Sequence, residues 1–138
     1  MIKTIDMAHM RYINLFQKIS HVSPQHCFIY NSAIILAVPE SQLKKAMGDN
    51  GRNLKKMSEI LGKKIKVVLV PDGIGDAEKF ISTIVYPTEI KGIEIDGNTL
   101  VINAGSQNKA ILIGRNKTRL EEMKKIVKGY FGKEVRIV

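Results

Sequence analysis

Two glycines with three-residue spacing, Gly48 and Gly51, lie in a loop whose residue types could hold a phosphate group. Glycine permits positive φ, and it lacks the side chain that would keep another backbone at a distance. A helical pattern starts at Leu54, and the first amides of a helix are unpaired donors with a partial positive charge. The loop is therefore suited to a phosphodiester backbone, although a lone pair of glycines is also typical of a plain connection between helices.

Basic residues surround this loop and a related loop that begins at Gly114. The candidate nucleic-acid-binding residues of the first loop are Lys44, Lys45, Gly48, Asp49, Asn50, Gly51, Arg52 and Lys55, of which the basic ones are candidate phosphate contacts. Those of the second are Lys109, Gly114, Arg115, Asn116, Lys117 and Arg119. A lysine-rich helix face is usually only a solvated surface, but its occurrence beside two similar loops favours a role in binding nucleic acid.

The charge of the chain is concentrated in its first half. The 138 residues carry a formal net charge of +9. Residues 1–71 hold eleven basic residues against four acids, whereas residues 72–138 hold eleven against nine. This excess favours a nucleic-acid partner over an acidic protein or an anionic membrane. No apolar run approaches the roughly 20 residues that span a bilayer, and the start of the chain does not resemble a secretory signal. With a single cysteine, the sequence predicts a cytoplasmic protein.

Other reactive residue types do not form a recognisable site. His9, His21, His26 and Cys27 lack the spacing of a zinc finger or ribbon, so we expect no metal. Adjacent residues of a strand point to opposite faces, so His26 cannot activate Cys27 as a nucleophile. The segment 73–75 lacks the Lys-Ser/Thr of a phosphate-binding P-loop and is better interpreted as a linker. The sequence therefore predicts no enzymatic activity, no cofactor and no small-molecule substrate.

The pattern of apolar residues predicts an α+β fold. A helix is expected over residues 4–20, with Thr4 as its cap, followed by a hairpin of two strands at 27–30 and 34–38. Helical patterns flank the first loop, and a strand follows at 65–70. The segment 71–75 combines proline, aspartate and glycine, which marks a boundary between domains 1–71 and 72–138. The second domain is expected to contain a helix from about Asp76, strands at 90–95 and 100–104, helices at 106–113 and 118–130, and a strand at 135–138.

The two halves align at an offset of 66 residues. Gly48 then corresponds to Gly114, and the apolar residues of the two following helices coincide, as for Met57 and Met123. A four-residue insertion near the end of the last helix shifts the match, so that the strand beginning at Ile65 corresponds to the strand beginning at Val135. The order of elements also agrees, which indicates an internal repeat.

With these motifs in place, the chain resembles the archaeal NusA-like factors of transcription termination and antitermination, which consist of two tandem type II KH domains. The resemblance covers nearly the whole chain, and its most specific parts are the segments 48–53, 61–65 and 113–117. It implies that each domain is a three-stranded mixed sheet with helices on one face. It also implies single-stranded RNA as the ligand and RNA polymerase as a further partner.

Two residues depart from the family pattern. Lys117 replaces the second glycine of the second loop, so we expect a weaker clamp there. Asp49 introduces a negative charge into the first loop, and either it or Asn50 could cap the following helix. The alternatives are a KH-domain factor of ribosome assembly or RNA decay, and a basic scaffold that docks on an acidic protein.

Overall fold

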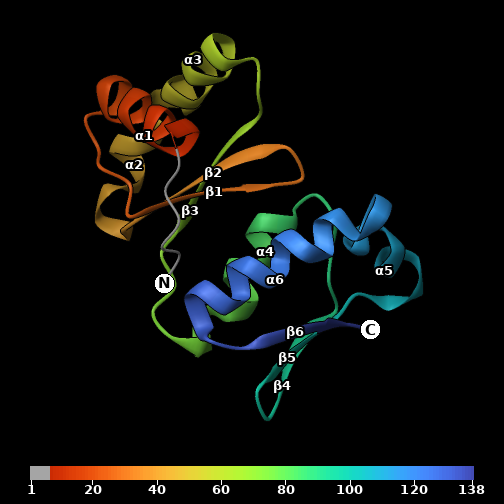
Figure 1. The fold of residues 1–138 in the computed structure, drawn as a ribbon. Coiled ribbons are helices and arrows are strands. Elements are labelled where there is room, and N and C mark those ends of the chain that lie inside the picture. Colours follow the sequence, from red (N-terminus) through yellow and green to blue (C-terminus); the bar gives the residue numbers. More distant parts are fainter. Residues whose placement is uncertain (1–6) are drawn as a thin grey trace. The chain divides into compact units, whose positions relative to one another are not determined.

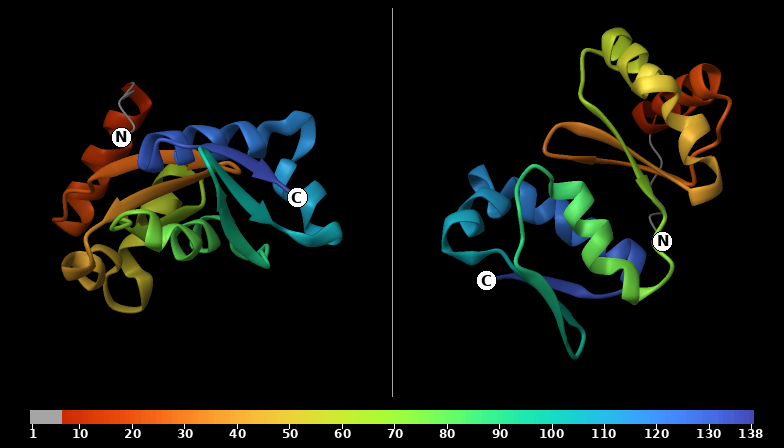
Figure 2. Two further views of the ribbon diagram at one scale, coloured as in Figure 1. Left: turned by 90° about the horizontal axis from the view of Figure 1, so that it is seen from below. Right: turned by 180° about the vertical axis from the view of Figure 1, so that it is seen from behind.

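The computed structural model describes residues 7–138, which form two compact units. The first unit extends to Val70 and the second begins at Pro71 (Figures 1 and 2). Each unit combines one three-stranded sheet with helices, so the predicted α+β class is confirmed. Within the described residues, no helix is both long enough and apolar enough to cross a lipid bilayer.

The first unit starts with helix α1, and its chain order confirms the expected one. Its elements are α1 (Met7–Ser20), β1 (His26–Tyr30), β2 (Ala33–Val38), α2 (Leu43–Met47), α3 (Arg52–Leu61) and β3 (Ile65–Leu69). The sheet order is β1-β2-β3, with β1 antiparallel and β3 parallel to the central strand β2. Asn31 and Ser32 both have positive φ, as the turn of a tight hairpin requires. The predicted cap Thr4 lies outside the described residues.

One face of this sheet forms a hydrophobic core with the helices of the same unit. Phe16 of α1, Ala46 of α2 and Met57 of α3 are fully buried against it. Ile34 and Leu36 of β2 are part of the same core and have no exposed surface. Both side chains therefore have a structural role and cannot line an open groove.

The second unit repeats this arrangement with its own elements. They are α4 (Ala77–Val85), β4 (Gly92–Asp96), β5 (Thr99–Asn103), α5 (Gly105–Ile113), α6 (Thr118–Phe131) and β6 (Glu134–Ile137). The sheet order is β4-β5-β6, again with one antiparallel and one parallel pair. The ring of Phe80 in α4 contacts the ring of Tyr130 in α6 edge to face, with 4.7 Å between centroids. This contact joins the first and last helices of the unit.

The four-residue insertion that interrupts the repeat lies in a helix. Helix α6 has 14 residues, whereas its counterpart α3 has 10. Four residues are about one helical turn, so the insertion lengthens the helix without rotating its apolar face. Both helices end at a glycine with left-handed backbone angles, Gly62 and Gly132. The strands β3 and β6 can therefore start in equivalent ways.

Candidate nucleic-acid interface

The first loop is a single tight turn that connects α2 to α3. Gly48 adopts φ 75° and ψ 173°, and residues Asp49–Gly51 form a tight turn. Asn50 and Gly51 both have left-handed angles. The Gly48 amide donates to the carbonyl oxygen of Lys44 at 2.9 Å, and the Gly51 amide donates to the carbonyl oxygen of Gly48 at 3.1 Å. The loop is thus fixed from within by the backbone.

The two glycines of this loop serve different purposes. A Cβ atom on Gly48 would lie 3.0 Å from the side chain of Asn53, which is tighter than normal packing. A Cβ atom on Gly51 would meet no atom within 4 Å. Gly48 is therefore needed for the turn itself, whereas Gly51 leaves open space at the start of α3, where another molecule could approach the backbone.

Asn53 links the two helices that flank the loop. Its Nδ2 atom donates to the carbonyl oxygens of Lys45 and Ala46, at 3.1 and 3.2 Å. These are among the last carbonyl groups of α2, which lack partners within the helix. The predicted cap of α3 by Asp49 or Asn50 is wrong: the N-cap position is Gly51, and no side chain caps the helix there. The loop geometry explains this, because the backbone turn puts glycine in the position that a capping side chain would need.

The second loop has nearly the same backbone as the first. Gly114 adopts φ 77° and ψ 172°, and Asn116 and Lys117 have left-handed angles. The Gly114 amide donates to Ala110 at 3.0 Å, and the Lys117 amide donates to Gly114 at 3.2 Å. Lys117 therefore takes up the conformation that Gly51 has in the first loop. The two loops differ in their side chains, with Arg115 in place of Asp49 and Lys117 in place of Gly51, and not in the path of the backbone.

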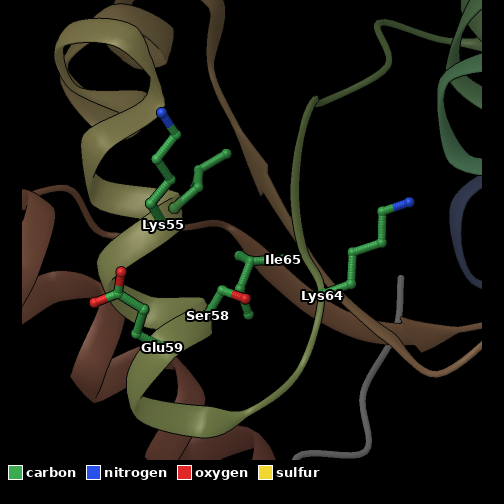
Figure 3. Close-up of a pocket in the computed structure, with 6 residues that line it drawn as sticks. Lys55, Ser58, Glu59, Lys64 and Ile65 are labelled. Carbon is green, nitrogen blue, oxygen red and sulfur yellow. The ribbon is translucent and has the colours of Figure 1, made fainter.

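A groove with a volume of about 380 Å³ lies beside the first loop, between α3 and the start of β3 (Figure 3). Its lining residues are Leu54, Lys55, Ser58 and Glu59 of α3, with Lys64 and Ile65 of the opposite segment. Leu54 follows Gly51 by three residues, so the groove continues the surface of the loop. Figure 3 shows Ser58 and Ile65 near each other, with Lys55 and Glu59 on successive turns of α3.

The predicted contacts of the first unit lie around one loop and its two helices. Lys44 and Lys45 are exposed in α2, and Arg52 is the exposed first residue of α3. Lys55 is the only one of the sequence candidates in the first unit that also lines the groove. The sequence candidates did not include the other five lining residues. One feature of the sequence could have identified the side of the groove opposite α3, because Lys64 directly precedes the strand predicted to begin at Ile65.

The predicted contacts of the second unit are arranged in the same way. Lys109 is exposed in α5, and Arg115, Asn116 and Lys117 are exposed in the loop. Arg119 is half-buried near the start of α6. A Cβ atom on Gly114 would lie 2.9 Å from the Cγ atom of Arg119 and 3.1 Å from its backbone nitrogen. Arg119 therefore packs against the loop where Asn53 does in the first unit.

The two units differ in charge at the positions that line the groove. Lys55 corresponds to Glu121 in the repeat, and Lys64 corresponds to Glu134. Both acids are engaged by lysines of α6: Glu121 with Lys124 at 3.2 Å and Glu134 with Lys128 at 3.5 Å. The position of Glu59 is taken by a lysine, Lys125. Over residues 7–138, only the first unit thus combines a glycine at the end of its loop with lysines along the groove that form no ion pair.

Residues considered for other chemistry are not assembled into a site. Cys27 is buried, and His26 is its neighbour on strand β1. Over residues 7–138, no group of three or more His, Cys, Asp or Glu side chains is placed to hold a metal ion.

Known proteins are similar to this chain in sequence and in fold. Residues 10–72 match the family of KH domains. A probable transcription termination protein NusA of Halococcus morrhuae is 21% identical over 131 residues, which cover 93% of this chain and 92% of that protein. A protein of the same description from Methanocaldococcus jannaschii is 28% identical over 120 residues, covering 84% of this chain and 64% of that protein. The crystal structure of APE1850 has a TM-score of 0.64 and 25% identity, covering 97% of this chain and all of that one.

The family match spans the first loop and the whole groove, and the two NusA relatives extend the likeness over most of the chain. These findings confirm the resemblance found from the sequence. Residues 10–72 thus match the KH-domain family, and over most of its length the chain is similar to proteins described as probable transcription termination protein NusA.

Proposed function

We propose that this protein binds single-stranded RNA, with the first loop holding the sugar–phosphate backbone and the adjoining groove receiving bases. The observation that carries the proposal is the open space at Gly51, at the N-terminus of α3 and beside the groove. A phosphate can approach the backbone closely there, and the helix dipole favours its negative charge.

The basic residues around the first loop strengthen this proposal. Lys44, Lys45, Arg52 and Lys55 are exposed on the two helices that meet at the loop. Each can neutralise a phosphate and release a counterion, which is the main source of affinity for a nucleic-acid backbone. Asp49 opposes them, since its carboxylate is exposed in the same turn. The loop should therefore bind more weakly than one with a basic residue at that position.

We assign the second unit a supporting role on the same strand. Residues 1–71 and 72–138 are the two KH domains of this proposal. In the second, Gly114, Arg115, Asn116, Lys117, Lys109 and Arg119 are the proposed contacts. The lysine side chain of Lys117 occupies part of the space that is open at Gly51, so its loop should contact phosphates through the ammonium group more than through backbone amides.

The biological role that we propose is in transcription termination or antitermination, without catalysis and in association with RNA polymerase. The descriptions of the two NusA relatives support this role over ribosome assembly or RNA decay. The charge around the loop supports a nucleic-acid ligand over an acidic protein. RNA would thus be held by charge and shape, with no chemical change to it.

RNA binding by the full chain tests this function directly. We expect it to bind a single-stranded oligonucleotide of about ten nucleotides more tightly than a duplex of equal length. The logarithm of affinity should fall linearly with the logarithm of salt concentration, with a slope of ~0.7 for each phosphate neutralised. Fluorescence anisotropy at four salt concentrations gives both quantities. Equal affinity for the duplex, or no measurable binding at low salt, contradicts the proposal.

Two neighbouring lysines of α3 can separate the contribution of the groove to RNA affinity from the contribution of net charge. Lys55 lines the groove, whereas Lys56 is exposed and does not line it. We expect Lys55→Glu to weaken RNA binding roughly tenfold and to reduce the salt slope by ~0.7, because a phosphate contact is lost. Lys56→Glu makes the same change in net charge and should weaken binding much less. If the two variants bind equally, the strand does not follow the groove.

A further inference from the structure

Glu59 is an unexpected residue to line a groove that is otherwise suited to an anion. It lies one helical turn after Lys55, at the outer edge of the wall that α3 forms, and in Figure 3 its carboxylate is directed away from Ile65. Within residues 7–138, its carboxylate forms no hydrogen bond or ion pair, although two lysines line the same groove. A carboxylate in this place repels phosphates and lowers affinity for the backbone. It must therefore contribute something else if the groove receives RNA.

An ionised carboxylate accepts hydrogen bonds and donates none. The bases of a single strand present their Watson–Crick edges to a protein. Cytosine, adenine and guanine each carry an amino group on that edge, which donates hydrogen bonds. Uracil has carbonyl oxygens in those positions and a single N–H between them. A carboxylate can thus accept from an amino group, whereas a uracil oxygen brought to the same place would be repelled.

The other lining residues provide the remaining surface that a base requires. Leu54 and Ile65 contribute apolar side chains, against which the face of a base can pack. The hydroxyl group of Ser58, which can donate or accept, lies next to Ile65 in Figure 3. The volume of about 380 Å³ falls within the range of sites that hold small ligands. The groove therefore combines apolar side chains with an acceptor at its outer edge.

We propose that Glu59 selects a base with an exocyclic amino group in this groove and discriminates against uracil. This inference rests on the proposed RNA binding and adds a specificity-determining residue to it. The second unit cannot make the same selection, because Lys125 takes the corresponding position and a lysine only donates hydrogen bonds. The protein should accordingly read base identity with its first unit.

Replacement of Glu59 by glutamine tests this selection. Glutamine has nearly the same shape, but its amide both accepts and donates, so it can pair with uracil as well as with an amino-bearing base. The ligands are an all-uridine hexanucleotide and three variants in which the two central positions are cytidine, adenosine or guanosine. For the wild-type full chain, we expect at least one variant to bind about tenfold more tightly than all-uridine RNA, near the lower end of what a good base contact contributes. In Glu59→Gln, this ratio should fall to about twofold or less.

Glu40→Gln is the matched control for the change in charge. Glu40 is exposed in the same unit and does not line the groove. It should raise affinity for all four ligands by a similar factor and leave their ratio unchanged. Equal binding of the four ligands by the wild type would overturn the selection while leaving RNA binding intact, as would an unchanged ratio in Glu59→Gln. Failure of the wild type to bind any of them would instead overturn RNA binding itself.

Discussion

Gly51→Asp is expected to reduce affinity for single-stranded RNA at least tenfold while changing stability by only ~1 kcal/mol. The aspartate would place a carboxylate in the open space at the start of α3, where we propose that a phosphate lies. Charge-assisted hydrogen bonds of the kind that would be lost contribute ~1.5–3 kcal/mol each. Repulsion between the two negative charges adds to this loss.

The cost of this substitution to folding is small for two reasons. Gly51 has left-handed angles, which aspartate and asparagine adopt more readily than other residues. The second loop already has a side chain at the equivalent position, since Lys117 adopts φ 61° there. A Cβ atom at Gly51 also meets no neighbour within 4 Å.

Gly51→Asn is the control that separates charge from size. Asparagine fits the same backbone and has nearly the volume of aspartate, but it carries no charge. We expect it to bind RNA better than Gly51→Asp and worse than the wild type. Affinity measured at two salt concentrations, with urea unfolding as the folding control, distinguishes these cases. A correctly folded Gly51→Asp with wild-type affinity would mean that the loop is only a connector.

The fold was predictable from the sequence because its signals are local and repeated. The Asn31–Ser32 turn, the apolar runs of β1 and β2, and the glycines that follow Met47 and Leu61 each mark an element or its boundary. The strand predicted from residue 90 starts at Gly92, and the helix predicted from 106 starts at Gly105. Such shifts are small because the hydrophobic pattern fixes the middle of an element better than its ends.

The groove was less predictable because its two walls are brought together by the fold. Ser58 and Glu59 lie on the part of α3 that is not buried, and in the sequence they are ordinary polar residues of a helix. Their position opposite Ile65 depends on the packing of α3 against the sheet. The capping prediction failed for a related reason. The sequence shows Asp49 and Asn50 before a helix, but only the backbone path shows that Gly51 holds the N-cap position.

The different purposes of the two loop glycines lead to the largest expected effect on stability. Gly48→Ala should reduce the free energy of unfolding of the first unit by ~2–4 kcal/mol. The angles of Gly48, φ 75° and ψ 173°, lie in a region that is almost restricted to glycine, and other residues there cost ~1–3 kcal/mol. The added Cβ atom would also lie 3.0 Å from the side chain of Asn53.

Relief of that contact would disturb the link between α2 and α3. Asn53 can move away only by lengthening its hydrogen bonds to Lys45 and Ala46, each of which contributes ~0.5–1.5 kcal/mol. Gly51→Ala is the matched comparison, because it makes the same chemical change three residues later, in open space. There the left-handed angles alone cost ~1–2 kcal/mol.

Urea unfolding followed by circular dichroism would compare the two variants with the wild type, and RNA affinity would be measured at low temperature, where both are folded. We expect Gly48→Ala to be the less stable variant. A larger loss of stability in Gly51→Ala would contradict the division of roles between the two glycines.

At the second loop, Gly114→Ala should resemble Gly48→Ala, because its Cβ atom would lie 3.1 Å from the backbone nitrogen of Arg119, which cannot move aside as a side chain can. The first glycine of each loop is thus required by the fold, and the freedom to replace the second by lysine, as at Lys117, follows from the same geometry.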